Sequence, residues 1–189
     1  VYEDRQGRLW IGSNNEGLAR FDHATEQFLH YSHVPHDPQS LSANILLSSI
    51  LQDSAGMLWI ATFDGLNRFD PETGQAIRYQ HDPVRPGSLS DNRVTVIFQD
   101  SGDVLWVGTF NGVNKWNYVS DVFRHLHVQS DGRGTLSGKV ITAVAESPDG
   151  ALWAGTYGDG LTRIDPATGA TAPFRHQPAD PLSLSDDRV

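Results

Sequence analysis

Residues 58–74 read LWIATFDGLNRFDPETG, and versions of this text recur along the chain. Its Leu-Trp pair occurs at Leu9-Trp10, Leu58-Trp59, Leu105-Trp106 and Leu152-Trp153. The successive tryptophans are 49, 47 and 47 positions apart. A fixed period of roughly 20 to 50 residues is typical of folds that are built from stacked repeats. The sequence therefore predicts four copies of one structural unit.

Two further groups of residues recur with the same period as the tryptophan. An Asp or Ser stands six residues before it, at Asp4, Asp53, Asp100 and Ser147. A Ser/Thr-Leu-Ser motif closes each unit, at Ser40-Leu41-Ser42, Ser88-Leu89-Ser90, Thr135-Leu136-Ser137 and Ser183-Leu184-Ser185. Agreement at this many positions excludes a chance repeat.

Each unit carries signals for four short strands joined by tight turns. In the third unit, residues 94–98 are a largely β-branched run that predicts a first strand, and residues 105–109, Leu-Trp-Val-Gly-Thr, are the expected second strand. Asn111-Gly112 after them is a strong hairpin signal. Four-stranded units of about 40 to 50 residues have the size of propeller blades. A β-sandwich would lack the period, and a parallel β-helix would need a much shorter one. We predict an all-β fold, a β-propeller segment of four four-stranded antiparallel blades over residues 1–189. Its repeats lie at approximately 1–46, 47–93, 94–140 and 141–189.

The ends of the chain fall within the repeat. Val1 is in register with Ile50, inside the expected first strand of a blade, and Val189 is in register with Val94, at the start of that strand. The first and last strands are therefore shared across a cut. Either the ends meet to complete one blade of a small closed ring, or the chain is a segment of a larger propeller. We expect the larger propeller, and we expect self-association, with a dimer completing a ring, because unpaired strand edges invite association.

Composition excludes several classes of function. The net charge of -9 argues against a nucleic-acid partner, because binding to the phosphate backbone needs clustered Lys and Arg. The chain contains no cysteine, so thiolate metal sites and disulfides are excluded. No apolar run reaches the length of a membrane span.

Residues 58–74, together with Tyr79-Gln80-His81-Asp82-Pro83 and residues 88–94, resemble the two-component regulator propeller repeats of bacterial sensor proteins. The resemblance covers the whole chain, four times over. The third unit departs most, because Trp116-Asn117-Tyr118-Val119-Ser120 replaces the Phe-Asp-Pro-Glu-Thr text. In that family such propellers are the periplasmic sensing part of membrane proteins, and the cytoplasmic part is a histidine kinase, often a hybrid one, or a diguanylate cyclase. The resemblance implies a periplasmic, non-catalytic sensor segment, with any kinase or cyclase activity in other domains.

The candidates for chemistry are weak beside this interpretation. His30, His33 and His36 have a spacing that could hold zinc, but His33 belongs to the repeat, and residues three apart on a strand point to opposite faces. The recurring serines are expected to hydrogen-bond backbone in a tight turn, since a catalytic residue should be singular. We therefore predict no metal, no cofactor and no enzymatic activity. A propeller lyase or hydrolase is the less favoured alternative.

Ligand contacts are expected on the face of the propeller that carries the loop between the second and third strands and the loop between blades. Loop residues that differ between units are not required by the packing that the units share, so they are the candidates for ligand contact. The candidates are Asn14, Asn15, Glu16, Phe63, Asp64, Arg93, Phe110, Asn111, Lys139, Tyr157, Asp159 and Arg188. Aromatic rings beside amides and carboxylates suit a small polar ligand, either a sugar or a peptide. The alternative function is a scaffold for protein–protein association or dimerisation.

Overall fold

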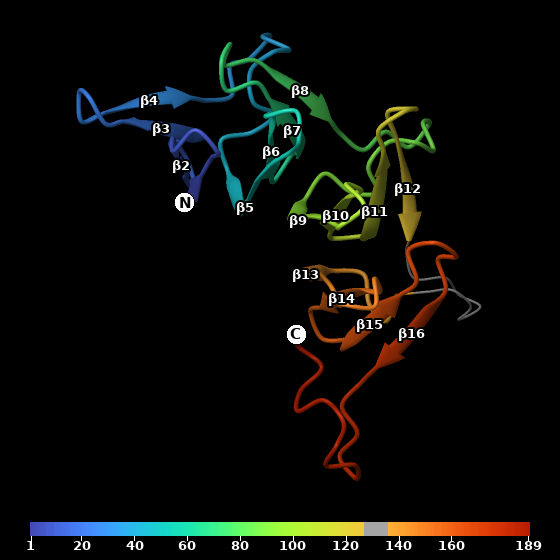
Figure 1. Cartoon of the computed structure of the whole chain (residues 1–189). Helices are drawn as coiled ribbons and strands as arrows, with labels where there is room; N and C mark the ends of the chain where they lie inside the picture. Colours follow the sequence, from blue (N-terminus) through green and yellow to red (C-terminus); the bar gives the residue numbers. More distant parts are fainter. Residues whose placement is uncertain (127–135) are drawn as a thin grey trace. The chain divides into compact units, whose positions relative to one another are not determined.

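The computed structural model describes residues 1–126 and 136–189, which form two compact units, residues 1–97 and residues 98–189 (Figure 1). Every regular element of the described residues is a β-strand, and these strands make four antiparallel sheets of four. Within each sheet the strands are neighbours in chain order, which is the topology of a propeller blade. The all-β prediction and the prediction of four four-stranded blades are confirmed.

The strands lie at corresponding positions in the four repeats. Blade 1 contains β1 (Tyr2–Glu3), β2 (Leu9–Gly12), β3 (Leu18–Asp22) and β4 (Gln27–Tyr31). Blade 2 contains β5 (Leu46–Gln52), β6 (Leu58–Thr62), β7 (Gly65–Phe69) and β8 (Ala76–Tyr79). Blade 3 contains β9 (Val94–Gln99), β10 (Leu105–Thr109), β11 (Gly112–Asn117) and β12 (Val122–Leu126). Blade 4 contains β13 (Ile141–Glu146), β14 (Leu152–Thr156), β15 (Leu161–Ile164) and β16 (Thr171–Phe174).

A hydrogen bond ties the repeated tryptophan of each second strand to the residue six positions before it. The three carboxylate pairs are Trp10–Asp4, Trp59–Asp53 and Trp106–Asp100, with Nε1–Oδ2 distances of 2.8, 3.0 and 2.8 Å. In blade 4 the indole Nε1 of Trp153 donates to Ser147 Oγ at 3.1 Å. Two of the repeated sequence features are therefore the donor and the acceptor of one hydrogen bond.

Within residues 1–97, blades 1 and 2 pack through a continuous apolar layer. The ring of Phe69 lies 5.6 Å from Trp10 and 4.9 Å from Tyr31, both in edge-on contact. The buried members of the layer are Trp10, Leu18, Leu41, Leu46, Leu58, Ile60, Phe69 and Ala76. Burying each large side chain in such a layer stabilises the fold by roughly 1.5–3 kcal/mol. The repeated tryptophan of blade 1, Trp10, therefore packs between blades 1 and 2.

A second connection between blades is polar. In the first unit, the backbone N–H of Arg5 in blade 1 donates to Gln52 Oε1 in blade 2 at 2.9 Å. In the second unit, the backbone N–H of Ser101 in blade 3 donates to Glu146 Oε2 in blade 4 at 2.8 Å. Each acceptor stands seven residues before its own tryptophan, and each donor stands five residues before its own. We call this repeated bond the inter-blade clasp.

The segment that closes each repeat is held by its own side chains. The Nδ1–H of His33, His81 and His176 donates to the carbonyl of Leu41, Leu89 and Leu184 at 2.8, 2.6 and 2.6 Å. Ser40, Ser88 and Ser183 accept a backbone N–H six residues upstream. The predicted turn role of these serines is confirmed, and so is the assignment of His33 to the repeat. Thr135 lies outside the described residues.

Trp116 replaces a phenylalanine of the repeat and is buried, at 7% exposure. Its indole Nε1 donates to Asp121 Oδ1 at 3.1 Å, in the turn between β11 and β12. Trp116 therefore belongs to the core of its blade. The new acceptor at Asp121 satisfies the N–H that a phenylalanine does not carry.

Candidate ligand-binding face

The loops between the second and third strands are fastened to the segments between blades by backbone hydrogen bonds. The glycine that precedes or opens each third strand donates its N–H to a carbonyl of the following inter-blade segment. The pairs are Gly17–Asn44, Gly65–Asn92, Gly112–Lys139 and Gly160–Asp187, at 3.0, 2.7, 2.8 and 2.7 Å. On their other side, Phe63 and Tyr157 donate to the carbonyls of Ile45 and Val140, both at 3.0 Å. The backbone of this face is therefore an ordered platform, as a binding site on loops requires.

Buried threonines stabilise the same loops from below. The Oγ1 of Thr62 donates to the carbonyl of Gly65 at 2.7 Å and accepts the N–H of Asp64 at 3.2 Å. Thr109 and Thr156 make the same pair of bonds in blades 3 and 4. These hydroxyls are part of the scaffold, because both their donor and an acceptor site are occupied by backbone.

Several of the predicted contact residues are also engaged by the scaffold. Asp64 accepts from Asn92 Nδ2 at 2.9 Å and from Gln80 Nε2 at 3.1 Å. Arg93 donates to Asp91 at 2.7 Å through Nη2, and this hydrogen bond, opposed by burial, lowers the pKa of the Asp91 carboxyl. The backbone N–H and the guanidinium of Arg188 lower the pKa of Asp186 in the same way. The role of Asp64, Arg93 and Arg188 in ligand binding stays a prediction.

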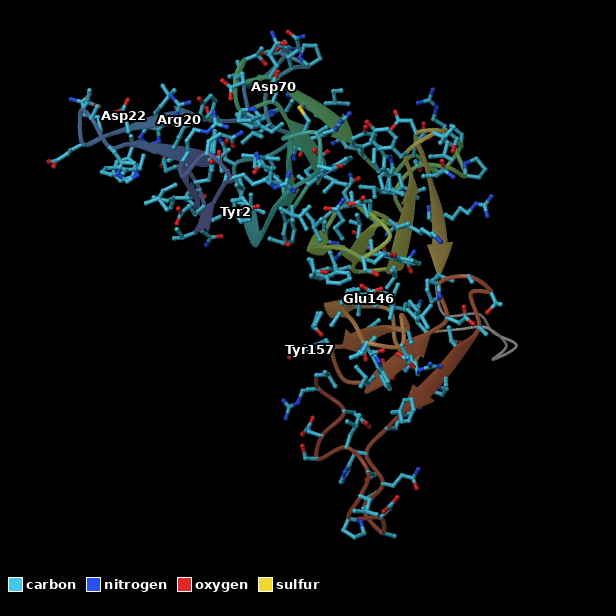
Figure 2. The ribbon with its side chains drawn as sticks, viewed as in Figure 1. Tyr2, Arg20, Asp22, Asp70, Glu146 and Tyr157 are labelled. Carbon is cyan, nitrogen blue, oxygen red and sulfur yellow. The ribbon has the colours of Figure 1, made fainter. Side chains whose placement is uncertain are left out.

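A second set of predicted residues is exposed and makes no side-chain hydrogen bond within the described parts of the chain. The set comprises Asn14, Asn15, Glu16, Lys139 and Tyr157. Tyr157, labelled in Figure 2, is 68% exposed at the end of β14, and Phe63 at the end of β6 is 44% exposed. Such exposed rings on an ordered backbone are available to contact the apolar part of a ligand.

Within each unit the structure brings some predicted residues together. In residues 1–97, Asp64 lies against Asn92, the neighbour of Arg93. In residues 98–189, Tyr157 and Arg188 form an antiparallel β-bridge, and Asn111 adjoins the Gly112–Lys139 bond. Asp159 lies 3.9 Å from Arg175, while Phe110 is half-buried.

Asn14 lines a cavity of about 390 Å³ beside β2 and β5, a volume within the usual range of ligand sites.

Gln80 and Arg175 are contacts of this face that sequence reasoning missed. Gln80 donates to both the backbone carbonyl and the carboxylate of Asp64, and Arg175 pairs with Asp159 and donates to the carbonyl of Ser137 at 3.0 Å. Both residues directly follow the aromatic residue that ends the fourth strand, and they differ between repeats. Variation between repeats, the signal that identified the loop residues, is therefore also present at the end of the fourth strand.

Residues 1–126 and 136–189 contain no group of three or more His, Cys, Asp or Glu placed to hold a metal ion. The same residues contain no helix of the length and apolarity needed to cross a membrane.

Solved structures similar to this chain include two from B. thetaiotaomicron. The extracellular domain of the hybrid two-component system BT3049 is 29% identical, with a TM-score of 0.81 over 93% of this chain and 24% of its own length. The extracellular domain of the one-component system BT4673 is 30% identical, with a TM-score of 0.69 over 94% of this chain and 24% of its own. This chain thus spans about a quarter of those structures. Virginiamycin B lyase from Staphylococcus aureus is 17% identical, with a TM-score of 0.66 over 94% of this chain and 55% of its own, and shares the fold.

None of the curated proteins matches the chain. The family model for the two-component regulator propeller matches four separate segments, residues 1–15, 40–64, 88–111 and 135–158. The first segment begins at residue 1 and the other three begin at a Ser/Thr-Leu-Ser motif, and all four end beyond the Leu-Trp strand in the loop of the candidate face. The four matches follow the four blades seen in the structure. The chain belongs to the two-component regulator propeller family.

Proposed function

We propose that the chain is the non-catalytic, ligand-sensing segment of a bacterial signal-transduction receptor of the two-component or diguanylate cyclase type. Family membership supports this proposal, and so does the similarity to two extracellular domains at 29% and 30% identity. The same similarity supports a location outside the cytoplasmic membrane, in the periplasm. Output activity would belong to other domains of the receptor.

The ligand that this face fits best is a small polar organic molecule, either a sugar or a peptide. The observation that carries the proposal is that two different groups of loop residues hold the backbone and face solvent. Repeated residues hold the backbone, whereas the side chains of Asn14, Asn15, Glu16, Lys139 and Tyr157 are exposed and make no hydrogen bond within the described residues. Rings such as Tyr157 bind the apolar face of a sugar or a peptide side chain, and nearby amides and charges bind its polar groups.

The hydroxyl and imidazole groups of the repeat favour a binding function over catalysis. The imidazoles of His33, His81 and His176 each donate Nδ1–H to a backbone carbonyl, and the nearby serines are held by backbone. A nucleophile needs an adjacent general base, but these groups face backbone partners instead. The likeness to virginiamycin B lyase, at 17% identity, extends to the fold alone.

The experiment is a screen of soluble oligosaccharides and short peptides by thermal shift, followed by calorimetric titration of the strongest hit. The test variant is Tyr157→Ala, and the matched control is Tyr118→Ala, because these tyrosines are 68% and 67% exposed. Tyr118 lies in the turn after β11, outside the candidate face. Tyr157→Ala is expected to weaken binding by about tenfold or more, the usual effect of removing an aromatic contact. Equal loss in the two variants, or loss in Tyr118→Ala alone, would contradict the proposal.

A further inference from the structure

Three buried polar side chains join blade 1 to blade 2 beneath the candidate face. Thr62, at the end of β6, and Asn67, in β7, are 0% exposed, and Ser42, in the segment between the blades, is 5% exposed. Asn67 Nδ2 donates to Ser42 Oγ at 2.9 Å, and Asn67 Oδ1 accepts the backbone N–H of Ser42 at 2.8 Å. Ser42 Oγ in turn lies 2.8 Å from Thr62 Oγ1. We call Ser42, Thr62 and Asn67 the polar bridge.

The number of available protons fixes the direction of these hydrogen bonds. Thr62 has a single hydroxyl proton, which it donates to the carbonyl of Gly65 at 2.7 Å. Ser42 must therefore donate to Thr62, and Ser42 Oγ keeps a lone pair that accepts from Asn67. The bonds run in one direction, from Asn67 through Ser42 and Thr62 to Gly65, and bonds in such a chain strengthen one another. Removing one member leaves its buried partners unsatisfied.

One end of the polar bridge holds a loop of the candidate face in blade 2. Besides its bond to Gly65, Thr62 Oγ1 accepts the N–H of Asp64 at 3.2 Å. The N–H of Gly65 donates to the carbonyl of Asn92 at 2.7 Å. These bonds fix the loop between β6 and β7, which carries the predicted ligand contacts Phe63 and Asp64.

The other end of the polar bridge holds a loop of the candidate face in blade 1. Ser42 lies in the segment that continues to Leu46 at the start of β5. In this segment the carbonyl of Asn44 accepts the N–H of Gly17 at 3.0 Å, and the N–H of Leu46 donates to the carbonyl of Ser13 at 3.1 Å. Both bonds fasten the loop between β2 and β3, which carries three of the predicted ligand contacts. The polar bridge therefore lies between two loops of the face.

Blade 4 shows the same positions with the polar bridge interrupted. The residues in register with its members are Ser137, Thr156 and Thr162. The backbone N–H of Ser137 donates to Thr162 Oγ1 at 2.9 Å, and the two hydroxyl oxygens lie 2.7 Å apart. Thr156 keeps the bond to its own loop, at the carbonyl of Gly160. Among the described residues of blades 3 and 4, Ser137 makes no hydrogen bond to Thr156.

We propose that the polar bridge couples the β2–β3 loop of blade 1 to the β6–β7 loop of blade 2, so that a ligand that orders one loop also orders the other. Ordering one element lowers the entropy cost of ordering a second element that is bonded to it. The interrupted bridge leaves the β14–β15 loop of blade 4 uncoupled from the segment before β13. The use of this coupling in sensing rests on the proposed function, whereas the coupling itself is a property of the free chain.

The test is amide hydrogen exchange, resolved by NMR, on the 189-residue chain without ligand. Thr62→Val removes the hydroxyl at nearly constant volume. It is expected to accelerate exchange at Gly65, in its own loop, and at Gly17, in blade 1, by about tenfold or more, because buried groups lose their partners. Thr95→Val is the matched control, since the hydroxyl of Thr95 in β9 is also buried but has no hydrogen-bond partner. It is expected to leave both glycine amides unchanged.

A second substitution separates coupling from general loosening. Ser42→Ala breaks the polar bridge but leaves Thr62 bonded to its own loop. In the Ser42→Ala background, Thr62→Val is therefore expected to accelerate exchange at Gly65 and to have no further effect at Gly17. The amides of β6 report unfolding of the whole unit and are expected to keep their exchange rates.

Blade 4 provides the same comparison without a bridge. Thr156→Val is expected to accelerate exchange at Gly160 and not at Gly112, whose N–H donates to the carbonyl of Lys139 in the segment before β13. Equal acceleration at Gly112 would show that the coupling does not need the bridge.

Three results would overturn the proposal. They are an unchanged Gly17 in Thr62→Val, a full effect on Gly17 that persists in the Ser42→Ala background, and acceleration of the β6 amides equal to that of the loops. A ligand screen without a hit would contradict the proposed function and leave these exchange results intact, so the two failures are distinguishable.

Discussion

The indole Nε1 of Trp59 donates a hydrogen bond to Asp53 Oδ2 at 3.0 Å, across the hairpin that joins β5 to β6. The same carboxylate accepts the backbone N–H of Ala55 and of Met57, both at 3.0 Å through Oδ1. Asp53 thus connects the tryptophan of the second strand to the turn that positions it. Because this pair recurs in blades 1 and 3, the spacing of six residues is a structural requirement of the blade.

Replacing Asp53 with Ala is expected to lower the free energy of unfolding by about 2–4 kcal/mol, because a fully buried indole N–H and two turn N–H groups lose their acceptor. Asp22→Ala is the matched control, since Asp22 also accepts two turn N–H groups but on the exposed outer edge. Urea unfolding followed by tryptophan fluorescence measures both. Equal losses in the two variants would show that the buried indole bond contributes nothing.

Asp4 predicts a loss of stability in acid. Burial alone would raise the pKa of its carboxyl, but hydrogen bonds from Trp10 and Arg8 outweigh burial and lower the pKa below the ordinary value of 3.8. The stabilisation from a lowered carboxyl pKa is fully present above the unfolded pKa and is lost as the pH falls through the folded one. The wild type should therefore exceed Asp4→Asn in stability at pH 7, and the difference should shrink as the pH falls below 3.8. A difference that stays constant with pH would contradict this account.

Two glycines of blade 4 separate backbone strain from crowding. Gly150 and Gly160 have φ of +79° and +81°, so alanine is strained at both. A Cβ on Gly150 meets nothing within 4 Å, whereas a Cβ on Gly160 collides with the carbonyl oxygen of Phe174. Gly150→Ala is expected to cost about 1–2 kcal/mol, and Gly160→Ala is expected to cost clearly more. Thermal unfolding of the two variants gives the comparison, and equal costs would refute the crowding.

Asn92 and Asn14 separate scaffold from surface on the candidate face. Asn92 accepts the N–H of His81 at 2.6 Å and donates to Asp64 at 2.9 Å, whereas Asn14 is exposed. Asn92→Ala is expected to lower the free energy of unfolding by about 1–2 kcal/mol. Asn14→Ala is expected to change it by less than about 0.5 kcal/mol. Denaturant titrations measure both values, and a neutral Asn92→Ala would remove Asn92 from the scaffold.

The fold could be predicted from one sequence because the residues that pack its blades recur in four repeats. The Trp59–Asp53 pair, the serine turns and the hairpin glycines each recur at fixed spacing, and recurrence marks a residue as structural. The candidate site could be predicted only as a set of loops. The hydrogen bond from the N–H of His81 to the side chain of Asn92 joins residues 11 positions apart. The sequence alone does not distinguish an asparagine that binds backbone groups from one whose side chain is open to a ligand.

The inter-blade clasp also escaped sequence reasoning. Gln52 and Glu146 occupy the same repeat position, but one is an amide and the other a carboxylate, and both residue types usually lie on protein surfaces. Only the three-dimensional arrangement shows that each accepts a backbone N–H of the preceding blade. Repeat position therefore predicted packing well, but it did not predict polar partners that come from another blade.

The most direct test of the account is amide hydrogen exchange, by mass spectrometry, with and without the compound that binds most strongly in the screen. Slower exchange is expected in peptides that contain residues 13–17, 63–65, 111–112 and 157–160, where the variable loop residues lie. The outer turns at residues 22–27 and 165–171 should exchange at unchanged rates. Protection confined to those outer turns would contradict the claim that this receptor segment binds its ligand on the loops at the ends of the second strands.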